Sequence, residues 1–479
     1  VLPRLIGADG YGALSRVLAP ANIVNNVVIS SSIQGVSRTV AEVPDDKAPE
    51  AFRRALRVHV AIAIPVALLF FFFAPLYARF QHAPHILRPL QVVSLVVLGY
   101  GLYAPLIGSL NGRRLFTRQA GLDVTYAVLR TSGLLGLGWF FARSDQGLLG
   151  ACIGFACAAL LILPIAARIS GLGRGGEAGA PVRAYLAFVG PVALGQIAVQ
   201  LLMQSDIMVL GHFASRLVVE QQGLAGEVAR KAADEIVAWY RGCQLFAFLP
   251  YQLLISLTFI LFPMLAKAKA EGDREAIAGF VRSGTRLALV FACIMVGTVS
   301  ALAPHLLRLV YPIEFGQRGG DALRVLALGQ GGFALLYVET TVLTSLGRER
   351  VSALLTWVAV ALIAGLSWLA GASSQGGVEL LERTAAATTI ALVLTAIAGA
   401  VVVRRVAGAF AAPLTLMRVF VALAATVLAG TRVPWLGKLF VIPEAGAVAL
   451  IALILLVVTR ELGRDDVAML RRVISRKRA

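Results

Sequence analysis

Long apolar runs recur along the whole chain and constrain its fold more than any other feature. Each run holds about 18 to 25 residues, enough for a helix at 1.5 Å per residue to cross the hydrocarbon core of a bilayer. A transmembrane β-barrel would show short alternating segments instead. The runs predict thirteen spans, near residues 12–33, 56–78, 87–110, 119–141, 148–169, 186–210, 236–265, 285–307, 322–346, 351–371, 385–403, 413–430 and 444–459.

The overall composition supports this reading. Hydrophobic residues make up 58% of the chain and charged residues only 15%, which excludes a soluble globular protein. We therefore expect an all-α polytopic membrane protein.

The net charge of +18 is not spread evenly over the connecting segments. One alternate set of connectors, which includes 34–57, 266–286 and the tail from Arg460, holds well over half of the 44 Lys and Arg residues. By the positive-inside rule this set faces the cytoplasm, and the basic tail RRVISRKRA is a cytoplasmic anchor rather than a nucleic-acid arm. A cytoplasmic C-terminus after thirteen spans places Val1 outside, so we expect that one preceding helix is missing.

The chain also resembles itself over about 150 residues. The segment ADGYGALSRVLAPANIVNN from Ala8 can be laid on ADEIVAWYRGCQLFAFLPY from Ala233, so that Asp9 falls on Asp234 and Arg16 on Arg241. Further on, FAPLYARF matches LAPHLLRL in the same order. Both copies cross the membrane in the same direction, which predicts a parallel repeat of two pseudo-symmetric six-helix lobes, a transporter architecture.

This repeat gives a domain plan with two lobes and a C-terminal extension. The Gly-rich stretch GLGRGGEAGAP has the composition of a flexible linker on the cytoplasmic side. We predict an N-lobe at 1–170, a linker at 171–185, a C-lobe at 186–407, and two extra helices with the basic tail at 408–479. Residues 213–235 are predicted to form an extra amphipathic helix at the outer surface.

Polar side chains recur at helical spacing on three of the spans, where hydrocarbon would penalise them. They are expected either to bond between helices or, as repeat-related stripes, to line a shared substrate cavity. The residues that we assign to this cavity are Asn22, Asn26, Ser30, Gln34, Gln196, Gln200, Gln204 and Gln252.

Several charged residues also lie within the spans. Arg130 is too deep to reach either surface, so we expect it to face a cavity or to pair with Asp123 or Glu339. Arg16 and Arg241 are predicted to lie near the outer mouth of the cavity. Guanidinium groups there suit bidentate binding of phosphate.

Cysteines and histidines give no sign of a metal or redox site. The four cysteines lie inside apolar spans without ligand spacing. The five histidines do not cluster with carboxylates along the sequence, and His82 and His85 in the loop QHAPH are interpreted as solvated. We therefore predict no metal and no cofactor.

Four motifs resemble the Wzx-type polysaccharide flippases of the multidrug/oligosaccharidyl-lipid/polysaccharide exporter (MOP) superfamily. LPRLIGADGYGALSRVL is similar to the loop after the family's first helix, and QSDIMVLGHF is similar to the Asp-containing segment that opens its second lobe. LPYQLLISLTFILFPMLAKAKAEGD and GLLGACIGFACAALL resemble a helix end and a helix start of the same family.

The resemblance implies alternating access in the bacterial inner membrane, with an undecaprenyl-diphosphate-linked oligosaccharide as substrate for O-antigen, capsule or exopolysaccharide synthesis. A monovalent cation gradient is expected to drive the cycle through Asp123, Asp206 or Glu339. The expected partners are the lipid-linked glycan, membrane lipids and a polysaccharide polymerase, and the protein is expected to act as a monomer.

Two alternatives share this fold: a drug/cation antiporter, and a lipid II flippase. An antiporter favours an acidic, aromatic cavity, whereas the candidates here are mostly Arg, Asn and Gln. A membrane enzyme such as a glycosyltransferase, polymerase or ligase would need a larger outer loop with acid/base residues, so we predict that the protein is not an enzyme.

Overall fold

The computed structural model describes residues 2–176, 178–179 and 181–463, and the part of the chain that it describes contains helices but no strand. The basic tail RRVISRKRA lies outside these residues. The helices form two compact units, the first ending at Ala238 and the second beginning at Trp239.

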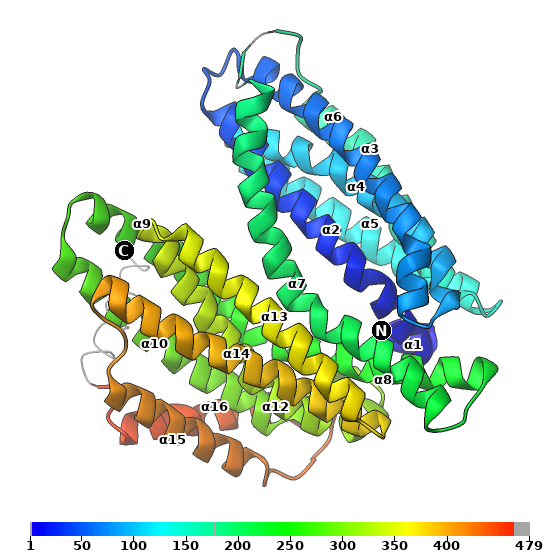
Figure 1. Cartoon of the computed structure of the whole chain (residues 1–479), viewed down its shortest axis with the longest axis vertical. Coiled ribbons are helices and arrows are strands. Elements are labelled where there is room, and N and C mark those ends of the chain that lie inside the picture. Colours follow the sequence, from blue (N-terminus) through cyan, green and yellow to red (C-terminus); the bar gives the residue numbers. More distant parts are fainter. Residues whose placement is uncertain (1, 177, 180, 464–479) are drawn as a thin grey trace. The chain divides into compact units, whose positions relative to one another are not determined.

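The first unit holds the helices coloured blue to green in Figure 1. Their bounds are α1 Leu2–Leu5, α2 Gly7–Ala41, α3 Ala48–Phe80, a 3-10 turn Pro84–Ile86, α4 Leu87–Gly112, α5 Phe116–Ala142, α6 Gly147–Ser170, α7 Val182–Glu220 and α8 Gly226–Ala247, whose last turns belong to the second unit.

The second unit holds the remaining helices, which Figure 1 colours from green to red. They are α9 Leu249–Ala270, α10 Arg274–Ala301, α11 Ala303–Val310, α12 Ile313–Ser345, α13 Glu349–Ser373, α14 Gly377–Ala407, α15 Pro413–Gly430, a 3-10 turn Lys438–Phe440 and α16 Val441–Val458.

Every predicted span falls on helical segments, although 236–265 covers parts of both α8 and α9, and 285–307 covers parts of both α10 and α11. Within the described residues, eleven helical segments are long and apolar enough to cross a membrane. The two predicted spans outside this set, 12–33 and 119–141, form α2 and α5, whose sequences carry more polar residues. The predicted all-α multi-pass fold is confirmed, whereas the number of helices per lobe stays a prediction.

The predicted outer helix at 213–235 is wrong. Residues up to Glu220 continue α7, a short turn follows, and α8 begins at Gly226. An apolar run that ends in a charged amphipathic stretch does not show where one helix stops, because helix can continue beyond the hydrocarbon.

The boundary between the units differs from the predicted linker at 171–185. Helix α7, which the repeat assigns to the second lobe, packs along α2 and contacts α3 in the first unit. These contacts move the boundary to Ala238. The lobe limits that the repeat predicts stay a prediction.

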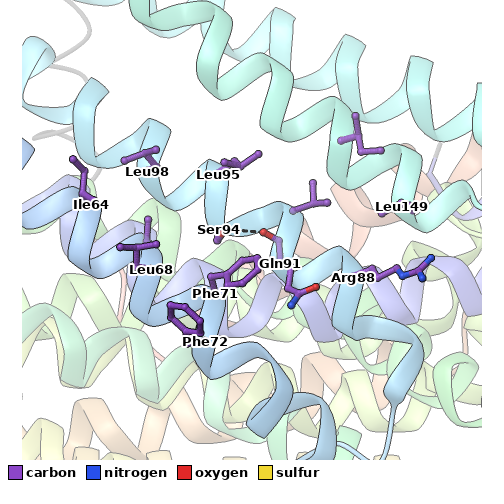
Figure 2. Close-up of a pocket in the computed structure, with 13 residues that line it drawn as sticks. Ile64, Leu68, Phe71, Phe72, Arg88, Gln91, Ser94, Leu95, Leu98 and Leu149 are labelled. Carbon is purple, nitrogen blue, oxygen red and sulfur yellow. Dashed lines mark hydrogen bonds between the residues drawn. The ribbon is translucent and has the colours of Figure 1, made fainter.

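Helix α3 presents large apolar side chains on its outside. Leu68, Leu69, Phe72 and Leu76 are all more than half exposed. An open groove between α3, α4 and α6 lies beside this face (Figure 2). In water such a surface would be a liability, but in a bilayer it is the expected lipid-facing side.

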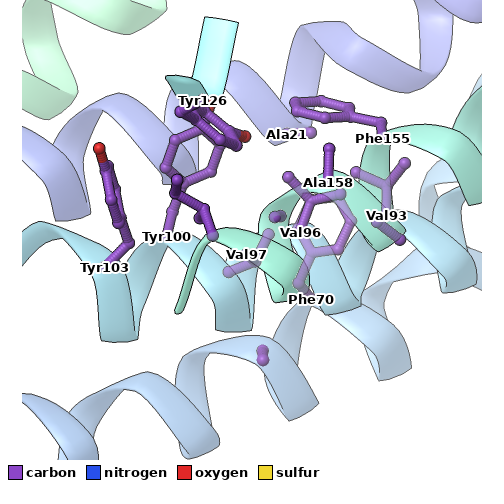
Figure 3. Close-up of a cluster of buried hydrophobic side chains, with 14 of the residues drawn as sticks. Ala21, Phe70, Val93, Val96, Val97, Tyr100, Tyr103, Tyr126, Phe155 and Ala158 are labelled. Carbon is purple, nitrogen blue, oxygen red and sulfur yellow. The ribbon is translucent and has the colours of Figure 1, made fainter. Parts of the chain in front are cut away.

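Helix α4 forms the centre of the first unit. Its hydrophobic residues face α2, α3 and α6 at once, as expected for a helix that is apolar all round. Figure 3 shows Val93, Val96 and Val97 of α4 packed with Phe70 of α3 and Phe155 of α6. This core fixes the relative positions of α2, α3, α4 and α6.

Helices α5 and α6 approach closely through small residues. A Cβ atom added at Gly133 would lie 2.4 Å from the carbonyl oxygen of Gly154, and one added at Gly154 would lie 2.0 Å from that of Gly133. Only glycine allows this contact between the two backbones, a common device of membrane helices.

In the second unit, α12 packs against α10 and α14, and the two C-terminal helices α15 and α16 pack against α10. Val290 and Cys293 of α10 are buried together with Val419 of α15 and Leu456 of α16. The two predicted extra helices therefore lie on the outside of α10.

Candidate functional site: a polar seam along helix α7

Polar contacts join helix α7 to α2 and α3 at three levels along its length, and at one end they also include α8. All of them lie in the first unit. We name this set the polar seam; it consists of Arg16, Asn26, Ser32, His59, Tyr185, Gln200, Ser215 and Asp234.

At one end of the seam, Arg16 of α2 forms a buried ion pair with Asp234 of α8. The guanidinium Nε lies 2.9 Å from Oδ1 of Asp234, and each residue is 2% exposed. Nη1 of Arg16 donates to Oγ of Ser215 on α7 at 2.7 Å. One arginine thereby ties three helices together, because its planar fork can serve several acceptors.

His85, which follows α3, also contacts this end of the seam. Its Nε2 lies 2.8 Å from Oδ2 of Asp234. The interpretation of His85 as a solvated loop residue is therefore wrong, because the fold brings it to a carboxylate that is distant in the sequence. In the second unit His305 likewise lies 2.8 Å from Glu444.

The approach of α2 to α8 depends on Gly12. A Cβ atom at this position would lie 1.7 Å from the backbone oxygen of Asp234, which no side chain can accommodate. The missing side chain lets the helices come close enough for Arg16 to reach Asp234 one turn further along α2.

In the middle of the seam, Nδ2 of Asn26 donates to Oε1 of Gln200 at 3.0 Å. Both residues were predicted to line a cavity. In the structure this pair bonds between helices, which was the other interpretation of the polar stripes.

At the far end of the seam, the ring of His59 on α3 links Ser32 on α2 to Tyr185 on α7. Nδ1 of His59 lies 3.0 Å from Oγ of Ser32, and Nε2 bonds the hydroxyl of Tyr185. All three residues are at most 4% exposed. Helix α7 is thus held at both ends and at its middle.

The other predicted cavity residues are placed unequally. Asn22, Ser30 and Gln196 are half-buried, and their side chains form no hydrogen bond within the described residues. Gln34 and Gln252 are exposed, whereas Gln204 is 5% exposed and its Oε1 has no partner in the described chain. The side chains of Asn22, Ser30 and Gln196 therefore keep hydrogen-bond donors and acceptors that no other described residue uses.

The predicted ion pair between Arg130 and Asp123 does not form within the described residues. Both side chains are exposed on α5. Asp123 lies seven residues before Arg130, two helical turns away along the axis. The guanidinium of Arg130 is therefore exposed and has no ion-pair partner within the described residues.

Arg241 behaves differently from Arg16, its counterpart in the repeat. It is half-buried on α8, and its Nη1 donates to Oε1 of Gln244 on the same helix at 2.9 Å. The matched sequence positions thus have unlike environments within their own units.

The three predicted coupling carboxylates also differ. Asp123 is exposed, and Oδ1 of Asp206 accepts from the backbone amide of Ile207 at 2.8 Å. Glu339 on α12 is completely buried, and neither carboxyl oxygen has a hydrogen-bond partner in the described chain. It lies against Gly399 of α14 and next to Leu336.

A groove in the second unit joins apolar walls to two arginines. It has a volume of about 800 Å³ and is lined by α10, α12, α14 and α15. Val393, Ile397 and Leu416 form part of the wall, and the exposed Arg282 and Arg404 contribute the charge. Neither arginine has an ion pair in the part of the chain that the structure describes.

Sequence reasoning missed most of the partners in the seam, namely Ser32, His59, Tyr185, Ser215 and Asp234. One signal was present: Asp234 had been matched to Asp9 in the internal repeat. The others are common residues in apolar spans, and nothing local marks them.

Comparisons with known proteins agree with this description. Residues 1–217 match the family of polysaccharide biosynthesis proteins. A search of the curated proteins gave no significant match. The fold is similar to that of the lipid II flippase MurJ in an inward closed conformation, with a TM-score of 0.72 and 13% identity over 96% of this chain and 95% of that one.

Two further similar structures are transporters. One is an inward-facing multidrug resistance MATE family transporter of the MOP superfamily, with a TM-score of 0.64 and 14% identity over 85% of this chain and 95% of that one. The other is a MOP superfamily transporter from Pyrococcus furiosus, with a TM-score of 0.56 and 14% identity over 84% and 91%. The predicted resemblance is confirmed, and these proteins are flippases and transporters rather than enzymes.

Proposed function

Since this membrane protein has the fold of MOP superfamily transporters and its first 217 residues match polysaccharide biosynthesis proteins, we propose that it flips a polyprenyl-diphosphate-linked oligosaccharide across the bacterial inner membrane. The match of residues 1–217 carries the proposal. Proteins that share this fold include flippases and drug transporters, and the matched family is one of polysaccharide biosynthesis. The C-terminus faces the cytoplasm in this proposal, and a polysaccharide polymerase uses the product.

The groove of the second unit supports an amphiphilic substrate. Its apolar walls fit a polyprenyl chain, and the guanidinium groups of Arg282 and Arg404 can bind a diphosphate by charge-assisted hydrogen bonds. The charge distribution of the sequence assigns this end of the groove to the cytoplasmic side, where a lipid-linked sugar would enter.

The half-buried polar residues of the first unit support the sugar part of the substrate. Asn22, Ser30 and Gln196 have no hydrogen bond to other described residues, so sugar hydroxyls can bond to them. Amide and hydroxyl groups are neutral, and a cationic drug would gain little from them.

Glu339 is the best placed of the predicted coupling groups. A carboxylate with no partner in an apolar interior is costly, so the neutral, proton-bound form is favoured there. In our proposal the bound cation is a proton, and its release accompanies a conformation in which Glu339 reaches water.

A lipid II flippase is a second candidate, favoured by the likeness to MurJ over 96% of the chain. Its substrate shares the polyprenyl diphosphate and differs in the headgroup. A cation antiporter is the third outcome to be tested.

The experiment reconstitutes the full chain in proteoliposomes and supplies three cargoes in parallel: a fluorescent polyprenyl-diphosphate oligosaccharide, fluorescent lipid II, and ethidium. We expect flipping of the oligosaccharide, measured by loss of fluorescence to a membrane-impermeant reductant. The double variant Arg282→Gln/Arg404→Gln should lose most of this activity, whereas Arg405→Gln, next to the groove but outside its lining, should keep it. Transport of ethidium alone would overturn the proposal.

A further inference from the structure

A second groove, in the first unit, has features of a ligand site that the proposed function does not use. It lies between α3, α4 and α6 and has a volume of about 650 Å³, within the range of lipid and small-molecule pockets. Helix α3 contributes Ile64, Ala67, Leu68, Phe71 and Phe72 to it, and Leu149 and Ile153 come from α6.

The groove changes from polar to apolar along α4. Arg88 and Gln91 lie at the start of this helix, and Leu95 and Leu98 follow one and two turns later on the same face. Because α3 runs antiparallel to α4, Phe71 and Phe72 lie toward the Gln91 end and Ile64 lies near Leu98 (Figure 2). Oγ of Ser94 donates to the backbone oxygen of Gln91 at 2.6 Å, so it leaves no free donor in the groove.

The charge at the polar end has no counter-charge in the groove. Arg88 is exposed and forms no ion pair within the described residues. Helices α4 and α6 carry no acidic residue, and the one acidic residue of α3, Glu50, lies at its opposite end. The groove therefore has a positive charge without a counter-charge at one end, next to walls of apolar side chains.

The length of the groove matches one leaflet of the membrane. From Arg88 to Leu98 is ten residues, or about 15 Å of helix, which is half of the roughly 30 Å hydrocarbon core. Arg88 also directly follows the polar turn between α3 and α4, where the headgroup region lies. The polar end is thus at the interface, and the apolar end is near the bilayer centre.

We propose that this groove is a binding site for an anionic phospholipid, with the phosphate at Arg88 and Gln91 and one acyl chain between α3 and α4. A guanidinium binds a phosphate through paired charge-assisted hydrogen bonds, and the amide of Gln91 adds a further donor. The bound lipid fills the space between α3, α4 and α6. The site is separate from the arginine groove of the second unit and takes a different lipid.

Native mass spectrometry of the full chain tests the proposal. The detergent-purified protein is titrated with dioleoyl phosphatidylglycerol, and in parallel with dioleoyl phosphatidylcholine as the neutral lipid. We expect one tightly bound phosphatidylglycerol and a clear preference for it over phosphatidylcholine. Arg88→Gln should weaken phosphatidylglycerol about tenfold and leave phosphatidylcholine unchanged, because only the charge-assisted bond is lost.

Two further variants separate the groove from general surface charge. Arg79→Gln removes an exposed arginine near the same end of α3 that does not line the groove, and it should bind lipid like the wild type. Leu95→Trp places a larger side chain in the groove at a 44% exposed position, and it should weaken both lipids. Both positions are exposed, so the fold should tolerate them.

Three results would overturn the proposal: no preference for phosphatidylglycerol in the wild type, an equal loss in Arg79→Gln and Arg88→Gln, or displacement of phosphatidylglycerol by a polyprenyl diphosphate of higher affinity. The last result would assign the groove to the transported lipid. Flipping activity is measured separately, so failure of the proposed transport function leaves this test intact.

Discussion

Arg16 and Asp234 are separated by more than two hundred residues of sequence, yet they form a buried ion pair 2.9 Å long between α2 and α8. The internal repeat had aligned Arg16 with Arg241 and Asp9 with Asp234. The observed pair therefore joins the arginine of one copy to the aspartate of the other. The charge of Arg16, predicted to await an anionic headgroup, is neutralised in this structure.

Breaking this pair should destabilise the protein strongly. In Asp234→Asn the guanidinium of Arg16 stays buried without a counter-charge, which costs about 3–5 kcal/mol of unfolding free energy. Replacing both residues by Arg16→Met/Asp234→Leu should recover much of the loss. A double-mutant cycle of unfolding in detergent measures both effects. The exposed pair Arg216–Glu220 is the control, and Glu220→Gln should show no comparable change.

Gly12→Ala should disturb the same end of the seam by steric means. The new methyl group would meet the backbone of Asp234, and overpacking of this kind typically costs about 1–3 kcal/mol. The matched control is Gly121→Ala on α5, where a Cβ atom meets nothing within 4 Å. Thermal melting of both variants checks the prediction, and equal melting temperatures would contradict it.

A reversible cross-link should reveal whether the middle of the seam opens during transport. Cysteines replace Asn26 and Gln200 in a background without the four native cysteines, one of which, Cys157, is exposed. A short bifunctional thiosulfonate reagent should then join α2 to α7 and reduce flipping in proteoliposomes, and reductant should restore it. Each single-cysteine variant is the control. Unchanged flipping by the fully cross-linked protein would show that α2 and α7 move together.

Glu339→Gln should abolish the response of flipping to a proton gradient without destabilising the fold. The amide is neutral and has nearly the same shape, so the buried site loses no ion pair and the protein should be at least as stable as the wild type. The flipping rate should no longer respond to an imposed proton gradient, as measured in proteoliposomes with defined internal and external pH. Glu382→Gln, on the exposed face of α14, should keep the response. A wild-type response in Glu339→Gln would remove this carboxyl from the mechanism.

Much of the fold could be predicted because, in a bilayer, an apolar segment forms a helix whatever the rest of the chain does. The thirteen predicted spans all fall on helical segments, including α2 and α5, since a helix is the one structure in which a single segment satisfies its own backbone hydrogen bonds in hydrocarbon. Helix ends were less predictable. Residues 213–220 continue α7 because hydropathy marks the membrane and not the end of hydrogen bonding.

The partners of polar residues could not be predicted in the same way. Asn26 and Gln200 were recognised by their helical spacing, but His59, Tyr185, Ser215 and Asp234 look ordinary in the sequence. Each acquires its role only from a residue on another helix. Arg130 was expected to face a cavity or to pair with Asp123 or Glu339; its side chain is exposed, and the pair with Asp123 does not form within the described residues.

The sequence by itself determined that this chain is a multi-pass helical membrane protein, because each long apolar run can be recognised from the sequence without knowing its neighbours in space. Only the tertiary structure decided that Arg16 pairs with Asp234, that α7 is fastened to α2 and α3, and that Glu339 is buried without a partner. Those facts depend on which helices pack together. A polar group in an apolar interior bonds with whichever residue that packing brings within about 3 Å.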